Sequence, residues 1–303
     1  MAIAAAGILM AAVCTGCFAA GRTGADPAVA NNQSQGSSPD PVPEGWSGIK
    51  RTGGMELLYA DQFSVDYYDG GYAMITIKDS GRYLVVPEGK SQPSGLPGDV
   101  AVIKQPLENI YLAATSAMDL FCSLDGTDRI TLSGTDASGW YIEEARSAME
   151  DGRMLYAGKY NAPDYERILS GSCDLAVEST MIYHSPEVKE QLERLGIPVL
   201  VERSSYESSP LGRMEWVKLY GVLLGREELA QTRFEEQMDS LLNVDFRSYV
   251  LLMKEAVTYM AAKKIRGNVV NITSTRADRA YPKDGLYGAV KAGINRGIQS
   301  FAL

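Results

Sequence analysis

Histidine is almost absent from this chain, because His184 is the only one among its 303 residues. One imidazole leaves little room for a histidine-based metal site or a Ser-His-Asp triad, and we interpret His184 as a surface or capping residue. Positive charge is also scarce, since 29 Lys and Arg against 38 Asp and Glu give a formal net charge of −9. That balance argues against nucleic acid as the main partner. The composition, 45% hydrophobic and 22% charged, excludes a collagen, a disordered acidic tail and a multi-span membrane protein.

Charge is missing altogether from the start of the chain, where the first charged residue is Arg22. Residues 1–20 form an apolar stretch that ends in small residues, which is typical of a signal segment and short for a membrane-spanning helix. The tripeptide Thr-Gly-Cys at 15–17 resembles the end of a bacterial lipobox, which implies lipidation of Cys17; a plain cleaved signal peptide is the alternative. Residues 21–54 are rich in Gly, Ser, Pro and Asn and predict a flexible tether. We therefore expect an extracytoplasmic, membrane-anchored lipoprotein.

Only two cysteines, Cys122 and Cys173, remain for the rest of the chain. A disulfide is compatible with export, but both cysteines have apolar neighbours, which equally predicts two separate buried thiols.

The C-terminal end differs from the rest of the chain in charge, because residues 231–303 carry 11 Lys and Arg against 7 Asp and Glu. This excess of positive charge in an acidic chain favours two segments of different character.

Strand and helix patterns alternate between residues 55 and 237. Runs of β-branched and aromatic residues bounded by turn residues predict strands, and apolar residues at helical spacing predict helices. We expect strands at 72–78, 83–89, 109–115, 128–134, 173–179 and 197–203, and helices at 116–124, 140–152 and 185–196. Strands alternating with helices of this length predict an α/β fold with a largely parallel sheet.

The segments DLAVEST (174–180) and PLGRMEWVKLYGVLLG (210–225) carry a resemblance to a known family. Together with the residues between and around them, over about 55–237, they resemble the extracellular substrate-binding proteins of ABC importers for iron complexes and cobalamin. The resemblance implies one lobe of a class III periplasmic-binding-protein fold at 55–210. It also implies that 211–242 forms the long helix that connects two lobes in that family.

Several residues in this region are candidates for function. Glu178, at a strand end, and the following Tyr183 stand where an open parallel sheet presents ligand groups, and the resemblance implies contact with a ferric or cobalt chelate. The alternative is a capping carboxylate and a half-buried tyrosine. Arg213 and Glu215 could hold an anionic ligand or one another, and we favour a structural role. Glu187 lies close to where the family carries a carboxylate that docks on the permease, although a first-turn glutamate also complements the helix dipole.

One glycine pair superficially suggests a dinucleotide site. The strand at 128–133 is followed by GTDASG (134–139) and a helix. The segment lacks the third glycine and the acidic residue about 20 residues further on that such a turn requires. We interpret it as an ordinary strand-to-helix loop.

Residues 238–303 resemble a second family. We expect a helix at 246–264, a strand at 265–274 and a helix from 286 to the C-terminus. Within this block, the YGAVK segment at 287–291 matches the YxxxK motif of short-chain dehydrogenases/reductases.

The resemblance assigns roles to three residues. Tyr287 and Lys291 share one helix face, so that the ammonium can lower the phenol pKa and Tyr287 can act as general acid or base while a nicotinamide exchanges a hydride. Ser274, 13 residues before Tyr287, would orient the substrate oxygen. The assisting asparagine of the family falls at Asp245.

The glycine-rich cofactor half of that family belongs upstream, where the binding-protein lobe stands instead. We therefore interpret 243–303 as a truncated Rossmann-like αβα segment with a silent motif, and the chain as a chimera of two incomplete families joined near 234–239. Our first hypothesis is the binding lipoprotein of an ABC importer, with permease and ATPase subunits as partners, an iron complex or corrinoid as transported ligand, and no resident metal. The alternative is an NAD(P)-dependent short-chain oxidoreductase.

Overall fold

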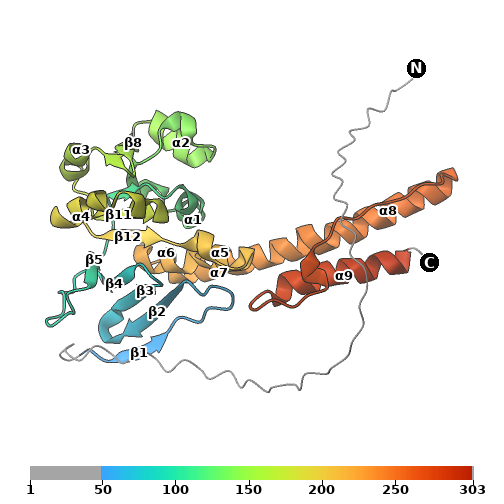
Figure 1. Ribbon diagram of the computed structural model, residues 1–303, viewed down its shortest axis with the longest axis horizontal. Helices are drawn as coiled ribbons and strands as arrows, with labels where there is room; N and C mark the ends of the chain where they lie inside the picture. The colour runs from blue at the N-terminus through green and yellow to red at the C-terminus, as the bar shows by residue number, and fades with distance from the viewer. Residues whose placement is uncertain (1–48, 302–303) are drawn as a thin grey trace, which may run out of the picture. The chain divides into compact units, whose positions relative to one another are not determined.

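The computed structural model describes residues 49–301, so the expected signal segment, Cys17 and most of the tether lie outside the described residues. Within them the chain contains two five-stranded sheets and the helices that pack against them (Figure 1). The predicted α/β fold class is confirmed. No helix in this described range is both long enough and apolar enough to cross a membrane.

The first sheet is mixed, with strand order β1-β2-β3-β4-β5. Its strands are β1 (Arg51–Gly54), β2 (Phe63–Tyr68), β3 (Ala73–Ile77), β4 (Gly81–Val86) and β5 (Val100–Lys104). The first three pairings are antiparallel and β4 pairs with β5 in parallel. The strands expected at 72–78 and 83–89 are present as β3 and β4, an antiparallel hairpin whose turn contains Asp79 with a φ of +52°. They belong to this mixed sheet, whereas the sequence predicted a largely parallel one.

The second sheet is entirely parallel, with strand order β12-β11-β6-β7-β8. Its strands are β6 (Ile110–Leu112), β7 (Ile130–Ser133), β8 (Leu155–Tyr156), β11 (Leu175–Ser179) and β12 (Val199–Glu202). Successive residues of β11 face two different apolar clusters, because Leu175 and Val177 pack into the larger core and Ala176 packs into the other. Burial of both faces explains the continuous apolar runs in the sequence.

Four helices accompany the parallel sheet (Figure 1). They are α1 (Met118–Ser123), α2 (Glu143–Glu150), α3 (Tyr165–Ser170) and α4 (Pro186–Arg194). The three expected helices correspond to α1, α2 and α4, each shorter than its sequence pattern suggested. In α4 the proline opens the first turn, where its missing N–H costs no hydrogen bond.

The expected single helix over 211–242 is three helices. They are α5 (Pro210–Glu215), α6 (Val217–Leu224) and α7 (Glu227–Leu242). Gly225 ends α6 with a left-handed φ of +64°, a conformation that favours glycine. From α7 the chain continues through a π-helical turn (Asn243–Arg247) into α8 (Ser248–Lys263), so the long helical stretch begins at Glu227 and ends at Lys263.

The C-terminal segment contains the expected second helix, α9 (Gly285–Phe301), which packs beside α8. The expected strand at 265–274 is wrong, because the structure has no regular element there. Val270 and Ile272 are 84% and 81% exposed, and no described strand lies beside them to pair with their backbone. A β-strand exists only where a neighbour satisfies its N–H and C=O groups. The expected αβα unit is therefore two helices joined by an irregular segment.

Candidate functional site

Exposed aromatic and methionine side chains follow several of the parallel strands at the edge where these strands end. All carboxyl ends of parallel strands meet at one edge of the sheet. The segments that leave this edge include the 3₁₀ turns η4 (Ala137–Gly139), η5 (Thr180–His184) and η6 (Ser204–Tyr206). We call the exposed apolar side chains on these segments and at the end of β8 the aromatic rim; they are Tyr141, Tyr156, Met181, Tyr183 and Tyr206. Tyr141 is the most open, with 96% of its surface exposed.

Glu178 lies beneath this edge rather than on it. Its side chain is 0% exposed, and neither carboxylate oxygen has a hydrogen-bond partner among the described residues. Burial raises the pKa of Glu178 to about 8, because desolvation disfavours the charged form. The carboxyl group is therefore mostly protonated at pH 7.

Tyr183 lies on the rim and is 43% exposed. Its hydroxyl donates to the backbone oxygen of Asp79, at 3.3 Å, and so ties η5 to the β3–β4 turn. His184, the last residue of η5, is exposed, as expected of a surface residue. Glu187 is exposed in the first turn of α4, where its charge complements the helix dipole and where a partner can reach it.

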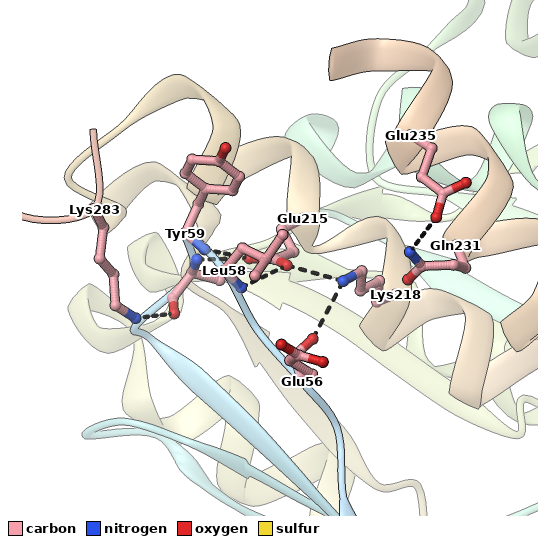
Figure 2. Close-up of polar contacts among 9 residues, drawn as sticks. Glu56, Leu58, Tyr59, Glu215, Lys218, Gln231, Glu235 and Lys283 are labelled. Atoms are coloured by element: carbon pink, nitrogen blue, oxygen red, sulfur yellow. Dashed lines mark hydrogen bonds and ion pairs between the residues drawn. The ribbon is translucent and has the colours of Figure 1, made fainter. Parts of the chain in front are cut away.

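Glu215 holds the loop between β1 and β2 (Figure 2). Its carboxylate accepts hydrogen bonds from the backbone N–H groups of Leu58, Tyr59 and Ala60, at 2.8–2.9 Å, and from Lys218 Nζ at 2.9 Å. Glu215 is fully buried and all its acceptors face donors of the chain itself. It forms no ion pair with Arg213, and its four donors all come from the chain, which gives it a structural role.

Glu207 continues the same arrangement, which the sequence patterns did not reveal. Its carboxylate accepts from the N–H groups of Asp61 and Gln62 and from Trp216 Nε1, at 2.8–3.1 Å. Five consecutive backbone amides, those of residues 58–62, thus point at two buried carboxylates. A glutamate three residues before a helix carries no sequence signal for this role.

The short-chain dehydrogenase motif keeps its local geometry. Lys291 Nζ lies 5.2 Å from the centre of the Tyr287 ring, as expected for positions four apart on α9. The same ammonium forms a 2.9 Å ion pair with Asp245 Oδ1, so the carboxylate at the position of the family's asparagine binds the motif lysine directly. Ser274 accepts a hydrogen bond from the backbone N–H of Arg276.

A cavity of about 300 Å³ brings together residues that the sequence had placed in two different sites. Its lining includes Arg213 from α5 and also Ser274 and Tyr287 from the C-terminal segment. Two contacts fix this segment locally: Arg276 donates to the Ser208 backbone oxygen at 3.3 Å, and Lys283 donates to that of Ala60 at 2.6 Å. We call this space the Arg213 cavity.

The one glycine turn that resembles a dinucleotide site does not fit NAD(P). A Cβ at Gly134 would lie 2.9 Å from Ala113 Cα, so this glycine serves the close approach of two backbone segments. The amides of Ser138 and Gly139 already donate to Asp136 Oδ1, at 2.9 and 3.2 Å. Because these N–H groups are occupied by a carboxylate of the chain, the turn offers no place for a pyrophosphate.

The described residues contain no disulfide and no cluster of side chains suited to a metal ion. Cys122 and Cys173 are both free thiols, so the disulfide that the sequence left open is not formed. Burial raises the pKa of Cys173 to about 11 and keeps it protonated. No group of three His, Cys, Asp or Glu side chains between residues 49 and 301 is arranged to hold a metal ion.

Comparisons with known proteins find similarities of two kinds. The family model for short chain dehydrogenase matches residues 221–303. A lipoprotein of Methanocaldococcus jannaschii, described as uncharacterized, is 23% identical in an alignment 215 residues long that covers 65% of this chain and 50% of that protein.

Among solved structures, a periplasmic haem-binding protein from Pseudomonas aeruginosa matches with a TM-score of 0.39 and 17% identity, covering 49% of each chain. The periplasmic vitamin B12-binding protein of Vibrio cholerae matches with a TM-score of 0.34 and 15% identity, covering 48% of this chain and 51% of the other. The chain spans about half the length of each of these relatives. The chain is thus similar to periplasmic binding proteins for haem and vitamin B12 over about half its length, and to short-chain dehydrogenases at its C-terminal end.

Proposed function

We propose that the chain is the extracytoplasmic ligand-binding lipoprotein of an ABC importer for iron complexes, of the siderophore, haem or cobalamin type. The observation that carries the proposal is the aromatic rim at the carboxyl edge of the parallel sheet. Ligands bind at this edge in open α/β folds, and exposed tyrosine rings offer flat apolar faces with a polar tip. The haem and corrin macrocycles, and the individual rings of catecholate ligands, offer flat faces for such contacts. In this proposal Tyr183, which is exposed, contacts the ligand directly. Glu178, which is buried, lies beneath the ligand site and does not touch the ligand.

Location and partners follow from the same proposal. The lipoprotein relative supports an extracytoplasmic location, with Cys17 as the lipidated residue. The permease and ATPase subunits of the importer are the proposed partners. Glu187 is exposed at the start of α4 and is the proposed contact to the permease.

Fluorescence titration tests the proposal. Trp140 is buried next to Tyr141 and donates to Ser133 Oγ at 3.1 Å, so its emission reports on the rim. Haemin, a ferric catecholate complex and cyanocobalamin are titrated separately, and one of them is expected to quench saturably. The Tyr141→Ala and Tyr183→Ala variants are each expected to weaken binding about 10-fold, since losing a stacked ring costs roughly 1–3 kcal/mol.

The matched control is Tyr259→Ala, because Tyr259 is also exposed but lies on α8, away from the parallel strands. Equal loss of binding in the control and in the rim variants would reject the rim as the ligand site. Absence of saturable quenching by all three complexes would reject the proposed function.

A second candidate, an NAD(P)-dependent short-chain oxidoreductase, is favoured by the neighbouring Tyr287 and Lys291 and by the family match at 221–303. We propose that this motif is silent, because the turn after β7 is closed by Asp136. Purified chain is assayed with NADH or NADPH and a panel of ketones, with Tyr287→Phe as the control. Turnover that disappears in Tyr287→Phe would reverse the ranking of the two candidates.

A further inference from the structure

We propose that the Arg213 cavity binds a small carboxylate-bearing molecule. The cavity lies where the start of α5 and the residues before it meet the segment that precedes α9. Its lining residues include two arginines, Arg213 and Arg276, three residues with hydroxyl groups that the inference uses, Ser208, Ser274 and Tyr287, and one carboxylate, Glu207. A volume of about 300 Å³ is at the small end of ligand pockets, which suits an organic acid of a few carbons.

Of the two arginines that line the cavity, Arg276 is paired with a carboxylate and Arg213 is not. The carboxylate of the lining residue Glu207 is already engaged, because it accepts three N–H donors, and Arg276 forms a 2.8 Å ion pair with Asp284. Arg213 donates to the backbone oxygen of Ser205 at 3.3 Å and has no carboxylate partner among residues 49–301. Arg213 is exposed, so an anion from outside can reach its guanidinium group.

Two hydroxyl groups among the lining residues are available as donors. The Ser274 oxygen accepts the N–H of Arg276 at 3.2 Å, which leaves its proton free to donate. The Tyr287 hydroxyl has no hydrogen-bond partner in the described part of the chain, and its ring is held by Lys291. A guanidinium fork with hydroxyl donors beside it matches the planar geometry of a carboxylate.

The inference goes beyond the proposed function, because it concerns a metal-free acid in a cavity formed in part by the C-terminal segment. It also gives Ser274 and Tyr287 a use that needs no nicotinamide. The expected site takes residues from both of the regions that resemble different families.

Calorimetric titration of the whole chain tests the inference, with succinate and benzoate as carboxylate probes and with inorganic phosphate and chloride as separate arms. Both carboxylates are expected to bind saturably and more tightly than phosphate or chloride. Arg213→Gln is expected to weaken carboxylate binding at least about 10-fold and Tyr287→Phe about 3-fold, as for loss of a charged and a neutral donor. Arg213→Lys keeps the charge but not the fork and is expected to fall between wild type and Arg213→Gln.

Arg146→Gln is the matched control, since Arg146 is a helix-surface arginine whose charge is paired with Glu143. Three results would overturn the inference. They are equal carboxylate binding by wild type and Arg213→Gln, tighter binding of phosphate than of the carboxylates, and no saturable binding of either carboxylate. If Arg213→Gln does not fold, the Tyr287→Phe result decides, because Tyr287 lines the same cavity from α9. Haemin, catecholate and cyanocobalamin titrations on the same samples separate the two proposals: carboxylate binding without binding of any complex would contradict only the proposed function.

Discussion

At the scale of single residues, Glu178 is the most unusual group in the lobe. The chain places a buried carboxyl group at the end of β11 without giving it a hydrogen-bond partner among the described residues. Burial of an unpaired carboxylate is so unfavourable that the group stays protonated instead. Its raised pKa makes the stability of the lobe depend on pH.

We predict that stability falls as the pH rises from about 4.5 to about 8, because the folded state holds the Glu178 proton over that range and the unfolded state does not. The free energy of unfolding should decrease by up to about 1.4 kcal/mol per pH unit from this group alone. Urea unfolding at pH 5, 6.5 and 8 measures the slope. Glu178→Gln removes the titration and should flatten it, leaving the variant more stable than the wild type at pH 8; an unchanged slope would contradict the assignment.

At the scale of elements, the contact between α6 and α7 sets the direction in which the chain continues after α6. The two helices follow one another with only Gly225 and Arg226 between them, and a Cβ at Gly221 would lie 2.5 Å from Ala230 Cβ. No side chain fits at that distance. Glycine at 221 therefore allows α7 to fold back against α6, at the expense of the helix propensity that alanine would bring.

We predict that Gly221→Ala destabilises the chain by about 1–3 kcal/mol, because overpacking outweighs the gain of about 1 kcal/mol in helix propensity. Thermal and urea unfolding both report this change. Gly98→Ala is the control: Gly98 lies in a loop where an added Cβ would meet no atom within 4 Å, and its substitution should be nearly neutral. A stabilising Gly221→Ala would show that the helices can separate at little cost.

At the scale of the whole molecule, the loop between β1 and β2 joins three parts of the described chain. Glu215 and Glu207 bind its backbone N–H groups from the side of α5, and Lys283 binds the backbone oxygen of Ala60 from the C-terminal segment. Packing of Phe63 on Trp216, with ring centres 5.0 Å apart, extends the same junction into the core. The first sheet is thus attached to the helices by buried polar groups as well as by apolar contacts.

We predict that Glu215→Ala lowers the free energy of unfolding by about 3–5 kcal/mol, because it leaves Lys218 charged and unpaired together with three backbone N–H groups. The exposed Glu150, on α2, provides the control, and Glu150→Ala should change stability by no more than about 0.5 kcal/mol. Amide hydrogen exchange at residues 58–60 should accelerate in Glu215→Ala only. Unchanged exchange there would refute the role given to Glu215.

Local sequence patterns are sufficient to predict many of the elements of this protein. The β3–β4 hairpin, the strands β6, β7, β11 and β12, the helices α1, α2, α4 and α9 and the proximity of Tyr287 to Lys291 all follow from periodicity, turn residues and helical spacing. These features depend on neighbours only a few residues apart. Their patterns can therefore be read along the chain.

Tertiary structure alone decided the features that depend on distant partners. Residues 265–274 have a strand-like sequence but stay irregular, since no described strand is there to pair with them. The helix break at Gly225 lets α7 pack against α6. Glu207 and Glu215 bind five amides that lie far from them in the sequence, and Arg213 and Tyr287 line one cavity although they are also far apart in the sequence. Pairing, burial and charge compensation are properties of groups brought together in space, and only the folded chain specifies which groups meet.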